Sequence, residues 1–242
     1  MRRWLVLVLV IGLVGCTTLS DTRKAAIRNV AVVSAIGDDV TLFRILGSKE
    51  KPERVDWTFK IATDAITQSV RSVNAGVSVV PVDCDSNVLA AGIHKYEAFE
   101  YFADPVRIEP TLRQITLGKS IDTIILVARN SSENGALLTY EGVGVVTERT
   151  VLPAAPILPF AGLTLFVIDG TTMKVLSRQT TLIKGPTYNV KPLVEFAPVG
   201  GPAPFLPGFT FPMNDEQKNF LRPILQGFVF TGTQRLMRDS GF

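Results

Sequence analysis

The chain has 242 residues, a formal net charge of +3 and 46% hydrophobic residues, with two cysteines and one histidine. A balance of 25 basic against 22 acidic residues lacks the strong overall positive charge that is typical of nucleic-acid-binding domains. The single histidine, His94, has no second histidine or cysteine at ligand spacing, which excludes a histidine-rich metal site.

The first sixteen residues have the organisation of an export signal. Arg2 and Arg3 precede an apolar run over 4–14, which is too short for a transmembrane helix. Leu13-Val-Gly-Cys16 follows, and this ending resembles the lipobox of bacterial lipoproteins. The resemblance implies acylation of Cys16 and removal of residues 1–15 as a lipoprotein signal peptide. The remaining chain has 23 basic and 22 acidic residues, a formal charge of +1.

Acylation at Cys16 would anchor the protein to a membrane, because several acyl chains hold far more firmly than one. Thr17 stands where an aspartate favours inner-membrane retention in lipoproteins of the enterobacterial type. The resemblance therefore implies the periplasmic face of the outer membrane rather than the inner membrane. Residues 16–28 predict a lipidated tether in front of one domain over 29–242. With Cys16 acylated, Cys84 has no partner for an intramolecular disulfide, and we expect a small buried residue there rather than a reactive thiol.

The segment 29–82 predicts strand, strand, helix, strand. Val30–Ile36 is a continuous apolar run typical of a buried strand, and Val40–Ile45 alternates, so the turn between them predicts a hairpin. Helical spacing of apolar residues predicts a helix that Asp56 caps and that ends near Val73. The run over 77–82 predicts an edge strand because it contains a proline. The first strand, this helix and the edge strand predict a parallel crossover unit.

The segment 83–182 predicts two helices and several strands. Residues 87–102 predict a helix capped by Asn87, and residues 110–118 predict a short helix with proline in its first turn and glycine after its end. Asp122–Ala128 predicts a buried strand, and residues 137–149 predict a strand that glycines interrupt. Residues 163–168 and 173–180 predict a hairpin through Asp169-Gly170.

The chain ends in a predicted helix that Asn214 and Gln217 start with a capping box. Phe220, Ile224 and Phe228 share one face of this predicted helix, while proline and glycine within it predict a kink or two helices. Val151–Phe160 holds three prolines and does not fit a compact core, because proline limits strand pairing and helix continuation. The Pro-rich insertion 186–212 holds seven prolines. Its aromatic residues either cover the sheet or bind a partner; the candidates for partner binding are Phe196, Phe205, Phe209 and Phe211.

Sequence patterns for catalysis or cofactor binding are weak. Gly142-x-Gly144 lacks the third glycine of a dinucleotide site, and Asp83–Asn87 lacks the glycine that a calcium loop needs after it. A weak cation site at Asp83 and Asp85 stays open as an alternative, but a turn in which Asp85 or Asn87 caps the following helix explains these residues better. Asp38 and Asp39 indicate a turn before they indicate a catalytic pair. We therefore predict no cofactor, no metal, no small-molecule substrate and no enzymatic activity.

The order of elements predicts an α/β (α+β) fold with a single mixed sheet, helices packed on it and a C-terminal helix. The opening strand Asn29–Val33, the helix after it, and Leu165–Leu176 with the terminal helix resemble the α/β domain of several envelope proteins. These are the curli-secretion channel subunit, the penicillin-binding-protein activator lipoproteins and the amino-terminal domain of the Tol-Pal translocation protein. The resemblance covers about residues 29–182 and 214–242 and implies binding and assembly.

Three functions stay open at this point. The first is a non-enzymatic lipoprotein that binds another envelope component through a sheet edge or through the proline-rich stretches 151–160 and 186–212. The second is a self-assembling export-channel subunit, which needs amphipathic strands of about 9–11 residues. Residues 137–149 are the only candidate, and Glu141 and Glu148 break their alternation. The third is a hydrolase whose site has no recognisable motif.

Overall fold

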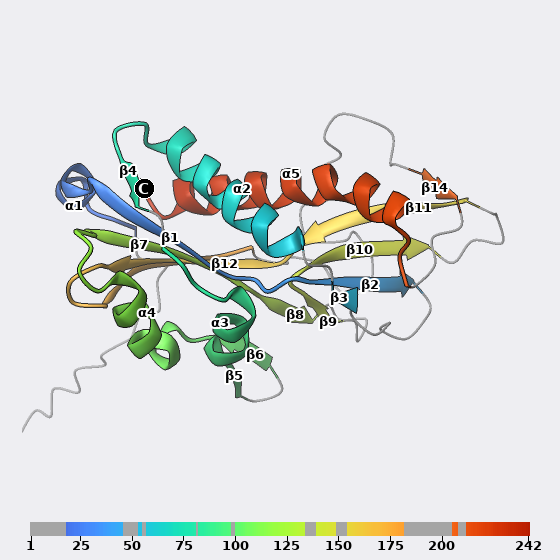
Figure 1. The fold of residues 1–242 in the computed structure, drawn as a ribbon, viewed down its shortest axis with the longest axis horizontal. Coiled ribbons are helices and arrows are strands. Elements are labelled where there is room, and N and C mark those ends of the chain that lie inside the picture. The colour runs from blue at the N-terminus through green and yellow to red at the C-terminus, as the bar shows by residue number, and fades with distance from the viewer. Residues whose placement is uncertain are drawn as a thin grey trace, which may run out of the picture.

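The structure is a computed structural model that describes residues 18–45, 53–54, 57–80, 82–97, 100–133, 139–148, 154–181, 205–207 and 212–242. Within these residues the strands form two five-stranded sheets and two short hairpins, with helices on both sides (Figure 1). The helices are α1 (Asp21–Ala26), α2 (Trp57–Val73), α3 (Ser86–Ile93), the 3-10 helix η1 (Pro105–Ile108), α4 (Glu109–Thr116) and α5 (Asp215–Asp239). The predicted mixed α/β class with a C-terminal helix is confirmed.

The first sheet is mixed and forms the centre of the domain. Its strands in spatial order are β13 (Val175–Thr180), β12 (Leu163–Asp169), β7 (Thr123–Arg129), β1 (Asn29–Ala35) and β4 (Ser78–Val80). β1 is parallel to β4 and β7, whereas β12 is antiparallel to β7 and β13. The predicted edge strand and the predicted hairpin after Asp169 are therefore both confirmed.

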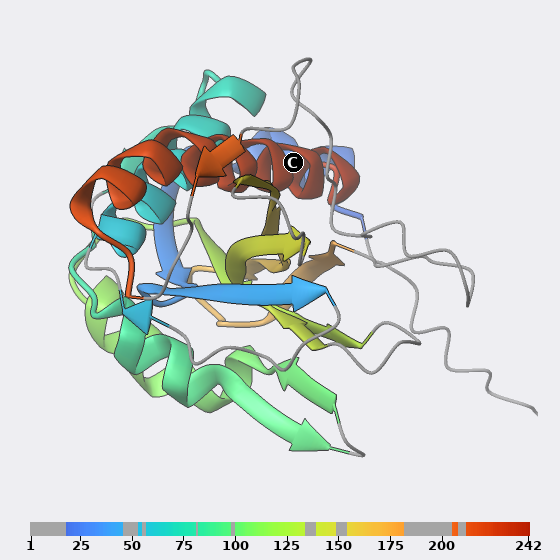
Figure 2. The same ribbon diagram turned by 90° about the vertical axis from the view of Figure 1, so that its right-hand side faces the viewer.

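Two apolar layers bury the two faces of this sheet. Val30 and Val32 of β1 point into a core with α2 and α5, whereas Ala31 and Val33 point into a core with α3 and α4. Alternate residues of a strand face opposite sides, so both sets are apolar when both faces are covered. Figure 2 shows the resulting layers, with α2 and α5 on one side and α3 and α4 on the other.

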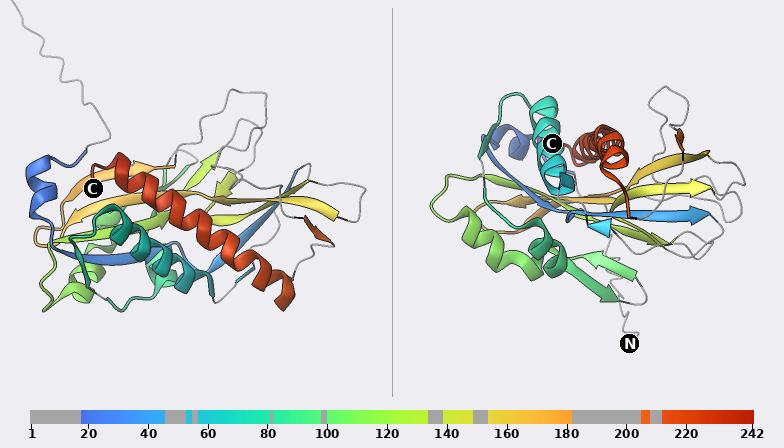
Figure 3. Two further views of the ribbon diagram at one scale, coloured as in Figure 1. Left: turned by 90° about the horizontal axis from the view of Figure 1, so that it is seen from above. Right: turned by 45° about the vertical axis from the view of Figure 1, so that its right-hand side comes forward.

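The second sheet continues the first along two of its strands. Its order is β14 (Phe205–Pro207), β11 (Ala154–Ala161), β10 (Val143–Glu148), β2 (Asp39–Ile45) and β3 (Glu53–Arg54). β2 follows β1 after a short link, and β11 leads directly into β12. β10 lies between β2 and β11, as β7 lies between β1 and β12. α5 runs along the molecule and contacts strands of both sheets (Figures 1 and 3).

Three backbone segments exchange hydrogen bonds where the two sheets meet. Asn130 N–H donates to the Gly162 carbonyl at 2.8 Å, Gly162 N–H to the Gly142 carbonyl at 2.7 Å, and Gly142 N–H to the Asn130 carbonyl at 3.2 Å. Between Asn130 and Gly142 the chain leaves the sheet as the hairpin β8 (Ser131–Glu133) and β9 (Thr139–Glu141). Gly142 has a φ of +68°, which suits glycine, so the chain can turn back into β10.

This arrangement corrects two predictions for the sheet. β1 and β2 do not form a hairpin, because β2 pairs with β10 in parallel and with β3, and runs on from β1. The strands also separate into two hydrogen-bonded sheets rather than a single one. In both cases the partner strand comes from a distant part of the chain, which local alternation does not reveal.

Two local predictions are also wrong. The helix predicted over 87–102 ends at Ile93, and β5 (His94–Glu97) and β6 (Glu100–Ala103) form a hairpin rich in aromatic residues, which favour strands. The proline-rich stretch 151–160 contributes β11. Prolines 156 and 159 are an odd number of residues apart, so their missing N–H groups fall on opposite edges of this strand and each edge loses one donor.

α5 is one helix of 25 residues rather than two, and its capping box is present. Asn214 accepts from Gln217 N–H at 2.9 Å, and the Gln217 side chain accepts from Asn214 N–H at 3.0 Å. The face that Phe220, Ile224 and Phe228 share is not the fully buried one, although Phe228 packs partly against the core. Phe220 is 36% exposed, and the residues that enter the core are Leu221, Leu225, Val229, Leu236 and Met237.

The described part of the predicted tether, residues 18–28, folds against the domain. Ser20 caps α1 by accepting a hydrogen bond from Arg23 N–H. Leu19 and Ile27 are buried, and Leu19 N–H donates to the Ser240 carbonyl at 2.8 Å. The two apolar side chains provide the reason: burial of each is favourable, so an extended linker does not form over these residues.

Candidate functional site at the amino-terminal end of the domain

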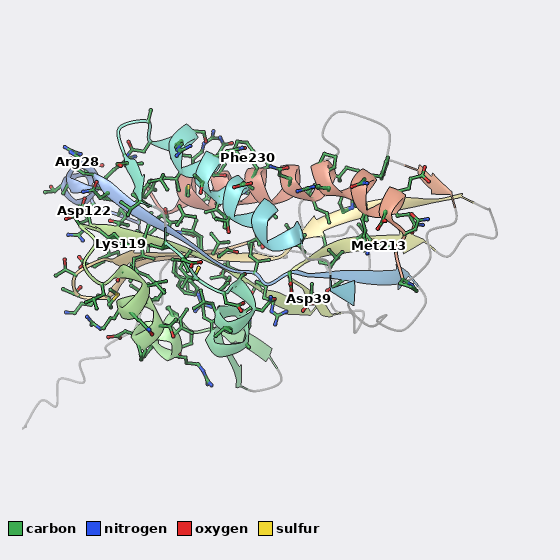
Figure 4. The ribbon with its side chains drawn as sticks, in the orientation of Figure 1. Arg28, Asp39, Lys119, Asp122, Met213 and Phe230 are labelled. Atoms are coloured by element: carbon green, nitrogen blue, oxygen red, sulfur yellow. The ribbon has the colours of Figure 1, made fainter. Side chains whose placement is uncertain are left out.

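Segments from four parts of the chain meet at one end of the first sheet. They are α1 with Arg28, the start of β7, the turn after β12 and the C-terminus of α5. Figure 4 labels Arg28, Asp122 and Lys119 at this end of the molecule. We call this end of the molecule, which holds α1, Arg28 and Asp122, the amino-terminal end.

Asp122, directly before β7, joins two of these segments. Its Oδ2 accepts hydrogen bonds from the N–H groups of Arg28 and Asn29 at 2.9 and 2.8 Å. Its own N–H donates to the Asn29 carbonyl, and its carbonyl accepts from Gly170 N–H at 2.9 Å. Asp122 therefore fixes the end of α1 and the turn after β12 relative to β7.

Asp169, the last residue of β12, organises the turn and binds α1. Its Oδ1 accepts from the N–H groups of Thr171 and Thr172 at 3.0 and 2.7 Å, and its Oδ2 forms an ion pair with Arg23. Burial acts to raise the pKa of this carboxyl group. Hydrogen bonds from Thr172 and Thr171 and the charge of Arg23 together outweigh burial, so the pKa lies below its ordinary value.

A cavity of about 390 Å³ lies beside these groups. It is lined by Arg23, Ala26, Ile27, Asp122, Thr123, Asp169, Thr171 and Thr172. Two buried atoms of its lining residues, Arg23 Nε and Thr123 Oγ1, have no hydrogen-bond partner among the described residues. The lining thus offers hydrogen-bond donors and carboxylate acceptors, which can hold a small polar group.

A second polar region lies at the carboxyl ends of β1 and β7, where open α/β sheets commonly bind ligands. Here the side chains hold the link from β1 to β2. Ser86 Oγ accepts from Gly37 N–H at 3.0 Å, and Asn87 Oδ1 accepts from Asp38 N–H at 3.1 Å. Asp39 lies 3.9 Å from Arg129. Asp38 is therefore a residue of the link, in agreement with the predicted turn, whereas Asp39 begins β2.

The remaining polar residues singled out in the sequence have structural contacts. His94 Nδ1 lies 2.6 Å from the Ala90 carbonyl oxygen, and Nε2 lies 3.0 Å from that of Arg129. Asp85 caps α3 by accepting from Asn87 and Val88 N–H at 2.8 and 3.2 Å. Among the residues that the structure describes, no three His, Cys, Asp or Glu side chains are grouped to hold a metal ion.

Cys84 is a free thiol, partly buried against the core on the α3 side of the sheet. Burial raises the pKa of this thiol, a backbone hydrogen bond with Ser34 opposes the rise, and the charges of Asp83 and Asp85 add to it. A protonated thiol is a poor nucleophile. The position therefore fits the predicted buried residue better than a reactive one.

The residues predicted for lipidation and partner binding fall largely outside the description. Cys16, Phe196, Phe209 and Phe211 lie outside the described residues, and Phe205 is placed only by its backbone in β14. Conversely, the grouping of Arg23, Asp122 and Asp169 was not predicted. The Asp169-Gly170 turn was its one local signal, because Arg23 and Asp169 are 146 residues apart.

No protein-family model matches the chain, and no curated protein sequence matches it. Similar solved structures include the PelC dodecamer from Paraburkholderia phytofirmans, at 11% identity and a TM-score of 0.34, with 86% of each chain covered. The hypothetical protein CT253 from Chlamydia trachomatis is similar at 11% identity and a TM-score of 0.30, over 89% of this chain and 94% of that one. Similarity of this extent carries no function from one protein to another.

Within the described part of the chain, no helix combines the length and the apolar composition needed to cross a bilayer.

Proposed function

We propose that this protein is a lipid-anchored binding and assembly module of the bacterial envelope, held at the periplasmic face of the outer membrane through Cys16. The sequence supports the anchor through the signal-like segment 1–15 and the lipobox-like ending Leu13–Cys16. The resemblance of its pattern to envelope lipoprotein domains supports binding and assembly as the role.

One structural observation carries the proposal further than the sequence does. Leu19, three residues after Cys16, is buried and hydrogen-bonded to Ser240. Two peptide units span at most about 8 Å between Cys16 and Thr18. A lipid on Cys16 would therefore hold the amino-terminal end of the domain against the membrane and direct the opposite end away from it.

The opposite end carries the second sheet and β14, as Figure 1 shows. β14 belongs to the Pro-rich insertion and pairs with β11, so residues 205–207 attach this insertion to the edge of the second sheet. The position supports a role in partner binding for the aromatic residues of the insertion, because the anchor would leave this end facing the periplasm.

Metabolic labelling with palmitate tests the anchor. The wild-type chain should incorporate the label, lose residues 1–15 and fractionate with outer membranes. Cys16→Ser should remove the label and change the fractionation, whereas Cys84→Ser should change neither. An unlabelled wild-type chain would refute the anchor.

Crosslinking in whole envelopes tests the binding role. Phe209→Ala combined with Phe211→Ala should reduce recovery of a crosslinked envelope protein while the urea-unfolding midpoint stays unchanged. Equal recovery from wild type and variant would remove these aromatics from the interface. A large homo-oligomer in size-exclusion chromatography of the detergent-solubilised chain would favour the export-channel alternative.

A further inference from the structure

Exposed basic side chains gather around the amino-terminal end. They come from α1, the residue after it, the last turns of α2 and α5, the link from α4 to β7, and the turn between β12 and β13. The residues are Lys24, Arg28, Arg71, Lys119, Lys174 and Arg238. Three contacts place their segments together: Leu19 with Ser240, Ser78 N–H with the Arg28 carbonyl at 2.6 Å, and Arg23 with Asp169.

Among the residues that the structure describes, few acidic groups lie at this end. The ion pairs of Arg23 with Asp169 and of Arg235 with Asp239, the latter at 3.7 Å, cancel within themselves. Of the described acidic residues at this end, Asp21 and Asp122 remain, so the formal charges of the six basic residues exceed theirs by four. The chain from residue 16 onward has a formal charge of only +1, so the rest of it is net negative.

Helix termini explain part of the pattern and leave the remainder. A basic residue in the last turn of a helix interacts with about half a negative charge from the helix dipole, which applies to Lys24, Arg71 and Arg238. Arg28, Lys119 and Lys174 lie outside helices and have no such role. A positive excess therefore persists after the helix ends are counted.

We propose that this basic surface binds the anionic headgroups of the membrane in which the lipid is anchored. The inference rests on the proposed function, since an acylated Cys16 brings the surface to within about one Debye length of the headgroups. Each basic residue at an anionic membrane surface then strengthens binding about fivefold. The lipid and the charges together would fix the orientation of the domain as well as its attachment.

Lysine reactivity in reconstituted protein tests the proposal. The lipidated full-length product is inserted into vesicles of phosphatidylcholine, with or without phosphatidylglycerol, and treated with a water-soluble amine-acylating reagent. Lys24 and Lys174 should react about fivefold more slowly when phosphatidylglycerol is present, and high salt should abolish the difference. Lys218, in the first turn of α5 at the opposite end, is the internal control and should react equally in both vesicles.

Charge-reversal variants identify the groups responsible. K24E/R238E should return Lys174 to the reactivity measured in phosphatidylcholine, whereas the matched variant K218E/R222E should leave its protection intact. Wild-type salt dependence supplies the same test without relying on either variant's folding.

Equal reactivity of Lys24 and Lys174 in both vesicles would overturn the proposal. Any protection of these lysines would then come from the acyl chains on Cys16 alone, without a contribution from the charge of phosphatidylglycerol. Failure of the anchor is seen separately, as a Cys16 peptide without acyl mass. Flotation of that unacylated chain with phosphatidylglycerol vesicles would still support the basic surface, and its absence would refute it.

Discussion

Asp122 and Asp169 each connect segments that lie far apart in the sequence. Asp122 accepts hydrogen bonds from two backbone N–H groups of the segment after α1. Asp169 accepts hydrogen bonds from two backbone N–H groups of its own turn and forms an ion pair with Arg23 of α1. Their carboxylates accept hydrogen bonds from backbone N–H groups where four segments converge. The attachment of the amino-terminal segment thus depends on two charged side chains.

We predict that Asp169→Asn destabilises the protein by about 1 kcal/mol at neutral pH. The amide keeps an oxygen that can accept the hydrogen bonds of the turn, but it loses the charge attraction to Arg23. The pKa of Asp169 is lowered in the folded state. Its stabilisation is therefore fully present above the ordinary aspartate pKa of about 3.9 and is lost as pH falls through the folded value. Urea unfolding at neutral and acidic pH measures the difference.

Thr171→Ala is the control, since it keeps the backbone N–H that Asp169 accepts and leaves the carboxylate charged. The difference in unfolding free energy between wild type and Asp169→Asn should shrink in acid. A difference that stays constant down to the lowest accessible pH would show that the carboxylate charge is not its source.

Gly144 is required where β10 passes between β2 and β11. A Cβ at this position would overlap the Thr41 carbonyl oxygen and lie 2.5 Å from Cζ of the fully buried Phe160. We predict that Gly144→Ala destabilises the protein by about 3 kcal/mol, because neither the backbone nor the buried ring can move away cheaply. Gly227→Ala, in α5 with open space around the added atom, should instead stabilise by up to about 1 kcal/mol. Equal effects of the two changes on the urea midpoint would contradict this difference.

At the level of elements, the apolar periodicity of α5 predicts a helix but does not identify its buried face. Phe220, Ile224 and Phe228 form one apolar stripe, and Leu221, Leu225 and Val229 form another, one position further along the chain. Both stripes have helical spacing, so the sequence predicts the helix and its capping box correctly. It does not decide which stripe is buried, because that depends on the strands beneath.

We predict that Leu225→Ala costs about 2–5 kcal/mol of stability, as removal of a fully buried side chain leaves a cavity. Phe220→Ala should cost well under half as much, since Phe220 is already partly in solvent. Urea unfolding of the two variants provides the comparison. A larger loss from Phe220→Ala would mean that the Phe stripe faces the core after all.

Other elements divide in the same way. The strands β1, β7 and β12, with their continuous apolar runs, and helices α2 and α4 are predicted because their signals are local. The proposed hairpin of β1 with β2 is wrong because the partner of β2 is distant in the chain, and the helix over 87–102 is wrong because the hairpin of β5 with β6 forms after Ile93. β2 pairs with β10, which lies about a hundred positions further along the chain. Where α3 ends, the Asp104 N–H donates a hydrogen bond to the Ile93 carbonyl.

At the scale of the whole molecule, the two sheets share one long framework. β1 with β2 and β11 with β12 run through both, and α5 packs along them. The segments that meet at the amino-terminal end come from distant parts of the chain, which the first sheet brings together. The ion pair and cavity of this end therefore could not be predicted from any local stretch, whereas the possible lipid anchor could, because a signal and its cysteine are contiguous in sequence.

The attachment of α1 decides how closely a lipid on Cys16 would hold the domain. A helix of six residues is not stable alone, so α1 depends on the packing of Leu19 and Ile27. We predict that Ile27→Ala, which removes about 2 kcal/mol or more of this packing, raises the detached fraction about thirtyfold. Trypsin should then cleave at Arg23, Lys24 and Arg28 correspondingly faster.

Thr22→Ala is the matched control, because Thr22 is exposed on the same helix and its change leaves the packing intact. Cleavage in the rest of the chain should stay at the wild-type rate in both variants if α1 detaches by itself. A free segment over 16–28 would reach about 45 Å from the membrane, against about 8 Å for the attached form. Unchanged cleavage in Ile27→Ala would mean that the contacts of Asp122, Asp169 and Ser240 suffice to hold α1, and that the spacing from the membrane does not depend on its apolar packing.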